Sequence, residues 1–355
     1  VGRKRMDDER WIEDDVHNAL RAKELVLPIY KACSPQLGLR RHFVRLLVFL
    51  SNSCELCLTA QHLAIYLLDF LMDHYDISVM QLNFISFVCL TLASKFEEKR
   101  VRIPRLQHLN YLARICGIDV VLNKKDMLEM ELQLLQELRW CINIPTPAHY
   151  ISYYLSVSVS EKDLYNGWPI PSLTGFKELV QKYAYYFLEI SVQDHNFLHF
   201  RPSLIAAASV CASRTCMEIF PPWTKDLASL THYSFADIAQ CTNMMLRLYV
   251  NDIEEADNIQ KVTIQHQNQE AGGNLSHQVT TQAVFQQSNY NPLGQHSNTS
   301  SHFHSAVQDL CAAYRESLQA CRSTGQLADR ASGSQDSCAD SQGSLWPSGH
   351  SLPIQ

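Results

Sequence analysis

The chain has 355 residues, of which 46% are hydrophobic, so it is long enough for two domains of about 150 residues or for one domain with a long tail. A formal charge of -6 excludes a global basic field that would attract nucleic acid phosphates. Residues 1–10 are charged, unlike a signal peptide, and no run of about 18 uncharged apolar residues is present. We therefore expect an intracellular protein without a membrane span, located in the nucleus, the cytoplasm or both.

Apolar residues recur at helical spacing along most of the first 250 residues, and strand signals are few. A first set of helices is predicted over residues 14–25, 36–51, 59–71, 79–96 and 126–138. Pro145 and Pro147 then break the pattern. A second set is predicted over residues 148–156, 176–191, 201–214, 225–230 and 235–250. Thr59 and Ser78 are the expected N-caps of the third and fourth helices.

Two of the predicted helices are apolar nearly all round. One contains the run at residues 84–93, and the other contains the small-residue run at 204–210. A helix that is apolar on every side is buried in the middle of its domain. Two sets of roughly 100 residues, each around one such helix, indicate an internal duplication of the fold in which each half holds its own core.

The composition changes near residue 258, after which Gln, Ser, His, Asn and Thr dominate. Residues 261–355 hold four Lys or Arg and six Asp or Glu, so this tail is neither a basic arm nor an acidic segment. It cannot bury enough apolar surface to offset its ordering entropy, which predicts disorder over residues 253–355. A loose helical pattern at 306–327 is compatible with a helix that a partner induces.

Truncation after about residue 258 is expected to leave the thermal unfolding midpoint nearly unchanged, because the tail carries almost no apolar surface for the core. Scanning calorimetry of the full and the truncated chain measures the difference. A large drop in the midpoint would show that the tail is part of the fold.

The sequence carries few signals of a metal site. The twelve cysteines are scattered singly through apolar stretches, as in a reduced protein. Cys54 and Cys57 have the spacing of metal ligands, but a structural zinc site needs a second pair, which is missing. His195 and His199 could lie one turn apart, without a glutamate or a third ligand beside them. We predict no metal and no cofactor.

Signals of catalysis are missing as well. The chain has no Gly-rich phosphate loop, no Gly-x-Ser-x-Gly elbow, no kinase catalytic loop and no His-Glu-x-x-His motif. Cys33 and Cys57 could each pair with a distant histidine as a nucleophile, but nothing local marks them. We therefore predict no catalytic residues and no enzyme activity.

The stretch Leu-Ala-Ser-Lys-Phe-Glu-Glu at residues 92–98 resembles the cyclin box. Further motifs fall in cyclin order and spacing from residue 15 to residue 250. They are Leu39-Arg40, His62-Leu63-Ala64 with Asp69, Met130-Glu131 with Leu135, residues 140–146, and residues 202–208 in the second cyclin fold. In detail, residues 66–69, 73–78 and 166–169 resemble the cyclin J group of that family.

The resemblance implies an all-α chain of two tandem five-helix cyclin folds. It divides the chain into an N-terminal segment with an amphipathic helix at residues 1–33, an N-terminal cyclin box at 34–146, a C-terminal cyclin fold at 147–252, and the disordered tail at 253–355.

The same resemblance implies an activator of a cyclin-dependent Ser/Thr kinase, with Lys95, Phe96 and Glu131 on the surface that packs against the mobile C-helix of the kinase. Lys95 ends an apolar helix, where an ammonium is favoured and can donate to partner carbonyls. Phe96 supplies an aromatic anchor. Glu131 is expected on the opposite side of its helix from Leu134 and Leu138, where it can accept from partner amides and orient Lys95.

On spacing alone, Lys95 and Glu131 would be an ordinary surface ion pair worth well under about 1 kcal/mol. The wider register of cyclin motifs favours the interface role instead. The family pattern also implies an internal salt bridge between Arg40 and Asp69. A phosphate-binding stripe that starts at Arg40 is less favoured, because apolar residues interrupt it and no aromatic platform accompanies it.

Many cyclins carry a hydrophobic patch on the first box helix that docks substrates with an Arg-x-Leu motif. In this chain the corresponding groove is expected to be more basic and shallower, so we do not expect ordinary substrate recruitment. The corresponding positions are Leu39, His42, Phe43, Leu46 and Asn83.

These observations predict a regulatory subunit of a cyclin-dependent kinase that acts in cell-cycle control and has no small-molecule substrate, nucleic acid partner or membrane partner. The alternative is a cyclin-fold adaptor of the kind that holds protein and DNA in transcription factors. DNA binding needs a basic face, and this chain is acidic overall. A kinase-binding protein that does not activate the kinase also stays open.

Overall fold

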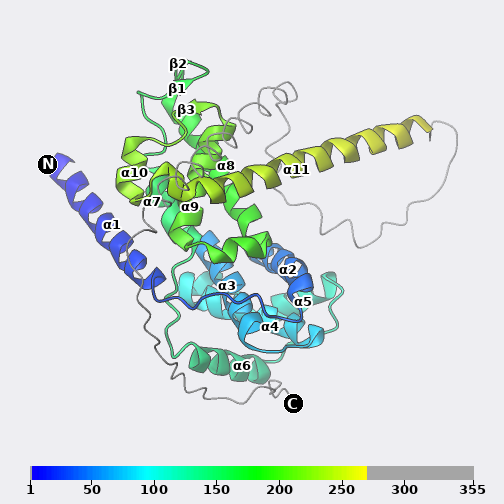
Figure 1. The fold of residues 1–355 in the computed structure, drawn as a ribbon. Coiled ribbons are helices and arrows are strands. Elements are labelled where there is room, and N and C mark those ends of the chain that lie inside the picture. Colours follow the sequence, from blue (N-terminus) through cyan, green and yellow to red (C-terminus); the bar gives the residue numbers. More distant parts are fainter. Residues whose placement is uncertain (1, 270–355) are drawn as a thin grey trace, which may run out of the picture.

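The computed structural model describes residues 2–269, and within them the side chains of residues 13–253. Two helical bundles follow one another along the chain, α2 to α6 and α7 to α11, with α1 before them (Figure 1). The helices are α1 Gly2–Glu24, α2 Arg40–Ser53, α3 Leu58–His74, α4 Val79–Glu97, α5 Leu106–Ile115, α6 Lys124–Glu137, α7 Pro147–Leu155, α8 Leu173–Gln193, α9 Pro202–Cys216, α10 Lys225–Thr231 and α11 Phe235–Gln269. The predicted all-α architecture of two tandem five-helix folds is confirmed, but the first bundle contains α5 in place of the predicted helix over residues 14–25, which belongs to α1.

Short 3-10 helices and strands complete the described fold. They are η1 Leu37–Leu39, η2 Arg100–Arg102, η3 His195–His199, β1 Leu164–Tyr165, β2 Trp168–Pro169 and β3 Ile219–Phe220. The strands form a small antiparallel sheet in the order β2-β1-β3, and Asn166 and Gly167, both with positive φ, form the β1–β2 turn. The sequence prediction missed this sheet because its strands have two residues each.

The N-terminal bundle is built around α4, as the sequence predicted. The Ser78 Oγ accepts from the Gln81 amide at 3.3 Å, and the Gln81 side chain accepts from the Ser78 amide at 3.0 Å, which forms a capping box. Among the described residues α4 is the one helix with the length and composition of a membrane span, and 61% of that stretch is buried. It packs against α2, α3 and α6, so its apolar surface is covered by the bundle.

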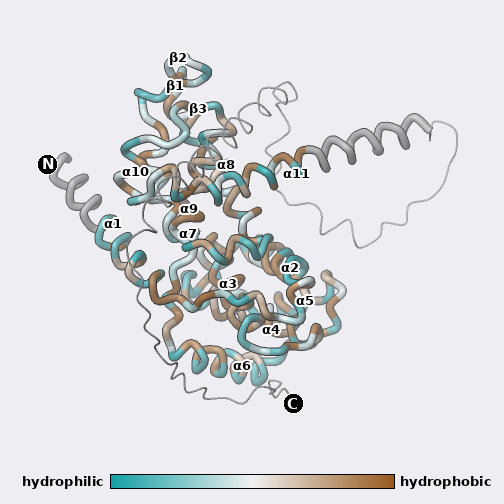
Figure 2. Tube along the Cα trace, viewed as in Figure 1, coloured by the Kyte–Doolittle hydropathy of each residue, from teal (hydrophilic) through white to brown (hydrophobic). Residues whose placement is uncertain are grey.

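The C-terminal bundle is built in the same way around α9. Pro202 occupies the first turn, where its missing N–H leaves no helical hydrogen bond unmade. The alanines at 206–208 are fully buried, and the small side chains let α7, α8 and α11 pack closely against this helix. In Figure 2, α4 and α9 lie inside their bundles, whereas α6 on the outer face carries hydrophilic turns.

Several predicted boundaries were wrong. Helix α5 was not predicted, since it has only ten residues between Pro104 and the left-handed Gly117. Helix α3 begins before Thr59, and Cys57 is its N-cap without a side-chain hydrogen bond. Helix α11 continues to Gln269, so the segment from 253 to 269, predicted to be disordered, is helical. The remainder of the predicted tail, including residues 306–327, lies outside the described residues.

Helix α1 packs against the C-terminal bundle, although the N-terminal box follows it in the sequence. The Glu24 carboxylate accepts from the backbone N–H of Ser203 at 3.1 Å and from its hydroxyl at 2.7 Å, at the start of α9. A carboxylate at this position stabilises the positive end of the helix dipole. The chain then crosses to the N-terminal bundle (Figure 1), where Asp73 accepts from the amides of Lys31 and Cys33.

Candidate functional site

Lys95 and Glu131 are brought together from the end of α4 and the middle of α6. The Lys95 ammonium donates to both Glu131 carboxylate oxygens, at 2.7 and 2.5 Å. The Lys95 side chain is 39% exposed, whereas that of Glu131 is 7% exposed. The carboxylate is therefore fixed by the bundle, and the ammonium lies where the bundle meets solvent.

The expected orientation of Glu131 was wrong. We expected its side chain to lie opposite Leu134 and Leu138, but Glu131 is buried on the same side of α6. The reason is the helical repeat, because residues three apart differ by about 60° around the axis. Glu131 therefore acts on the surface through Lys95, whose position it fixes.

Exposed apolar residues occur close to this ion pair in the sequence of α4, α6 and the segment just after α6. Phe96 follows Lys95 and is exposed, as an anchor residue must be. On α6, Leu128 and Leu132 are exposed one turn apart, on either side of Glu131 in the sequence. Trp140 is 63% exposed just after α6 and has a left-handed backbone with φ of 62°. We call Lys95, Phe96, Leu128, Glu131, Leu132 and Trp140 the α4/α6 surface.

The sequence pattern did not identify Leu128, Leu132 and Trp140 as surface residues. A signal for the two leucines was present, since the inward face of α6 is already provided by Met127, Met130 and Leu134. Leucines outside that stripe face solvent, and neighbouring exposed leucines on one helix are typical of an interaction surface.

Arg40 and Asp69 form a buried ion pair between α2 and α3. The Arg40 Nε donates to Asp69 Oδ1 at 2.6 Å, and its Nη2 donates to Oδ2 at 2.8 Å. The Arg40 side chain is 2% exposed. Burial lowers the pKa of the guanidinium, but the charge and the hydrogen bonds of Asp69, together with the charges of Tyr30 and Asp194, outweigh burial, so the net effect is a raised pKa.

The five positions that were predicted to correspond to a substrate-docking patch do not form an apolar groove on α2. Phe43 and Leu46 are each 1% exposed and belong to the N-terminal core, which corrects their assignment to a surface patch. Leu39 and His42 are exposed, and Asn83 is half-buried on α4. Phe43 and Leu46 lie on the inward stripe of an amphipathic helix, so they are unavailable to a docked peptide.

Metal ligation and thiol catalysis have little support in the geometry. Within residues 13–253, no group of three or more His, Cys, Asp or Glu side chains could hold a metal ion. Burial raises the pKa of Cys54 to about 11 and also raises the pKa of Cys57. Both thiols are therefore protonated at neutral pH, whereas a nucleophilic cysteine must be a thiolate.

Comparison with known proteins decides the family. Residues 15–143 match the cyclin N-terminal domain and residues 145–287 match the cyclin C-terminal domain. The chain is also 43% identical over 328 residues to the Cyclin-J-like protein of Mus musculus, across 91% of this chain and 83% of that protein. The chain belongs to the cyclin family. Cyclins are regulatory proteins rather than enzymes, and this chain is a regulatory protein of that family.

Two further similar proteins are a Cyclin-J and a viral cyclin. This cyclin is 49% identical over 242 residues to Cyclin-J of Xenopus laevis, which covers 68% of this chain and 63% of that protein, less than two thirds of its length. The X-ray structure of a viral cyclin from herpesvirus saimiri aligns with a TM-score of 0.48 and 18% identity, covering 64% of this chain and 95% of the viral chain. The C-terminal match to residue 287 extends past residue 252, the predicted end of the second cyclin fold.

Proposed function

We propose that this cyclin binds a cyclin-dependent Ser/Thr kinase through the α4/α6 surface and stabilises the active position of the kinase C-helix. The observation that carries the proposal is the Lys95–Glu131 pair, in which a buried carboxylate fixes a half-exposed ammonium beside Phe96. The cyclin fold supports the same role, since cyclins regulate through binding.

Lys95 keeps hydrogen-bonding capacity for a partner. An ammonium has three N–H donors, and two of them are used by the Glu131 oxygens. The third can donate to a backbone carbonyl, such as those at the C-terminal end of a partner helix. Because Glu131 holds the side chain in place, little rotamer entropy is lost when the partner binds.

Apolar burial provides the affinity in this proposal. Phe96, Leu132 and Trp140 are exposed in the free cyclin, and residues of these types dominate interfaces when a partner covers them. The kinase needs its strand lysine paired with the C-helix glutamate to hold ATP phosphates correctly. A rigid surface that fits only the paired arrangement shifts the kinase population toward it.

The proposal includes a role in cell-cycle control, in the nucleus, the cytoplasm or both. It excludes substrate recruitment through an apolar groove on α2, because Phe43 and Leu46 are in the core. The balance of charge also fits docking by specific contacts, since residues 1–260 carry 26 basic and 30 acidic side chains. Net charge then contributes little steering to association.

We expect the double change Lys95→Ala and Glu131→Ala to weaken kinase binding at least ten-fold while helicity is kept, because it removes the fixed donor from the surface. Co-expression with candidate cyclin-dependent kinases, then calorimetric titration of the purified partners, measures the dissociation constant. Circular dichroism reports helicity.

The matched control is Lys125→Ala with Glu129→Ala, which removes an exposed ion pair of 3.7 Å on the same helix. That pair should have almost no effect on binding. Failure of the unchanged cyclin to bind any cyclin-dependent kinase at micromolar concentration would contradict the proposal. Phosphorylation of a histone substrate by the complex separates an activator from a non-activating binder.

A further inference from the structure

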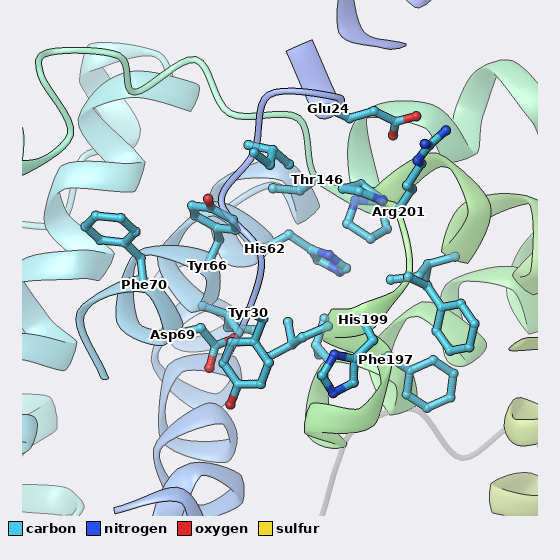
Figure 3. Close-up of a pocket in the computed structure, with 18 of the residues that line it drawn as sticks. Glu24, Tyr30, His62, Tyr66, Asp69, Phe70, Thr146, Phe197, His199 and Arg201 are labelled. Atoms are coloured by element: carbon cyan, nitrogen blue, oxygen red, sulfur yellow. The ribbon is translucent and has the colours of Figure 1, made fainter. Parts of the chain in front are cut away.

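A cavity of about 330 Å³ lies where the two bundles and the chain after α1 meet. Figure 3 shows that its walls come from α3 on one side and from the η3–α9 region on the other, with Tyr30 from the connecting segment. Most of the lining is apolar, including Ile65, Phe197 and Ile205. A cavity of this size and composition is in the range of small-molecule sites.

His62 is the unusual residue of this cavity. Its side chain is 3% exposed, and neither ring nitrogen has a hydrogen-bond partner from the protein. Figure 3 shows the imidazole directed from α3 toward the second bundle. Burial lowers the pKa of His62 to about 3, with a smaller contribution from His149, so the ring is neutral and offers one donor and one acceptor.

Arg40 provides a second unused group. Its Nε and Nη2 bind Asp69, but Nη1 is buried without a partner from the protein. Asp69, the partner of Arg40, follows His62 by seven residues on α3. Seven residues of α-helix span about 10 Å, so the Arg40–Asp69 pair and His62 lie about 10 Å apart along this helix. The Arg40 charge is neutralised by Asp69, so the group acts as a hydrogen-bond donor more than as an anion site.

Other buried polar side chains of the cavity have partners. The Glu24 carboxylate binds Ser203, and the Thr146 hydroxyl binds His149 at 2.8 Å. The hydrogen-bonding groups without a protein partner are therefore those of His62 and Arg40, which lie at two points of an apolar cavity. Buried polar groups without partners are costly, so a molecule that satisfies both gains affinity.

We propose that this cavity binds a small, elongated and uncharged organic molecule with an apolar body, an amide-like group at His62 and a hydrogen-bond acceptor at Arg40. The two bundles and the connecting segment all contribute to the walls, so the bound molecule contacts each of them. This site is separate from the α4/α6 surface in its residues and in its test.

The probe is 6-acetyl-2-naphthamide, which carries an amide and a ketone at opposite ends of a flat apolar body. The comparison probe is 6-acetyl-2-naphthoate, which replaces the amide by an anion. We expect the amide to bind at least ten-fold more tightly to the full chain in a fluorescence titration. We also expect it to shift the imidazole nitrogen resonances of His62 in histidine-labelled protein.

Three variants test the assignment. His62→Phe should remove the preference for the amide, and His108→Phe, on α5 and outside the cavity, should leave it unchanged. Leu198→Trp, which fills the cavity from η3, should weaken the binding of both probes at least ten-fold. This variant keeps the test decisive if His62→Phe does not fold.

Equal affinity for the two probes would overturn the proposal, because the cavity would then select only apolar bodies. Absence of binding of either probe at its solubility limit would also overturn it, since the cavity would hold solvent alone. An amide preference that persists in folded His62→Phe protein would remove His62 from the site.

Discussion

Asp69→Ala is expected to lower the free energy of unfolding by about 3 to 5 kcal/mol, because it leaves the Arg40 guanidinium buried without its counter-charge. Arg40 is 2% exposed and lies between α2 and α3, so its guanidinium has little access to water in the folded chain. Urea unfolding followed by circular dichroism measures the loss.

The double variant Arg40→Met with Asp69→Leu should recover most of that stability, because apolar residues of similar volume replace a buried ion pair at little net cost. Asp76→Ala, an exposed aspartate just after the same helix, is the control and should change stability by less than about 0.5 kcal/mol. A loss below about 1 kcal/mol in Asp69→Ala would mean that the unpaired guanidinium finds solvent.

The C-terminal bundle has a comparable buried pair that no sequence pattern predicted. The fully buried Arg214 of α9 donates to the Asp163 carboxylate at 2.9 and 3.0 Å, and to the carbonyls of Ser158 and Pro221. Asp163 precedes β1 and is 51 residues away in the sequence. Helical periodicity reports local spacing only, so it cannot join residues on separate elements.

The helices were predictable for a local reason, since their apolar stripes follow the 3.6-residue repeat and Ser78 and Gln81 form a capping box at α4. The docking of α1 on the C-terminal bundle was not predictable in this way. It depends on Glu24 meeting Ser203, which are 179 residues apart. Tertiary contacts of that range are not encoded in any short pattern.

The candidate site was predictable in part. The positions Lys95, Phe96 and Glu131 came from the resemblance to cyclins, and the structure brings the two charged groups together. The burial of Glu131 and the exposure of Leu128, Leu132 and Trp140 required the packing of α6 against α4. Trp140 in particular is exposed because the chain turns with a left-handed backbone after α6.

His62 is expected to make the protein sensitive to acid. Its pKa is lowered from 6.5 to about 3 in the folded chain, so protons bind the unfolded state first as the pH falls below 6.5. The folded state is therefore fully stable, as far as His62 is concerned, above the His62 pKa of the unfolded chain. This stability is lost as the pH falls toward the His62 pKa of the folded chain. Between pH 7 and pH 5, this histidine is expected to lower the free energy of unfolding by about 2 kcal/mol.

Comparison of the unchanged chain with His62→Phe isolates this effect from other titrating groups. Glu97 also destabilises the fold in acid. Burial raises the pKa of its carboxyl, but the hydrogen bond and charge of His149 and the hydrogen bond of Thr59 together lower it, and both proteins share that contribution. Urea unfolding from pH 7 to pH 5 should therefore show the unchanged chain losing about 2 kcal/mol more than the variant. Parallel stability curves would mean that the His62 imidazole becomes protonated inside the fold, which would require solvent or a carboxylate to reach the ring from the cavity.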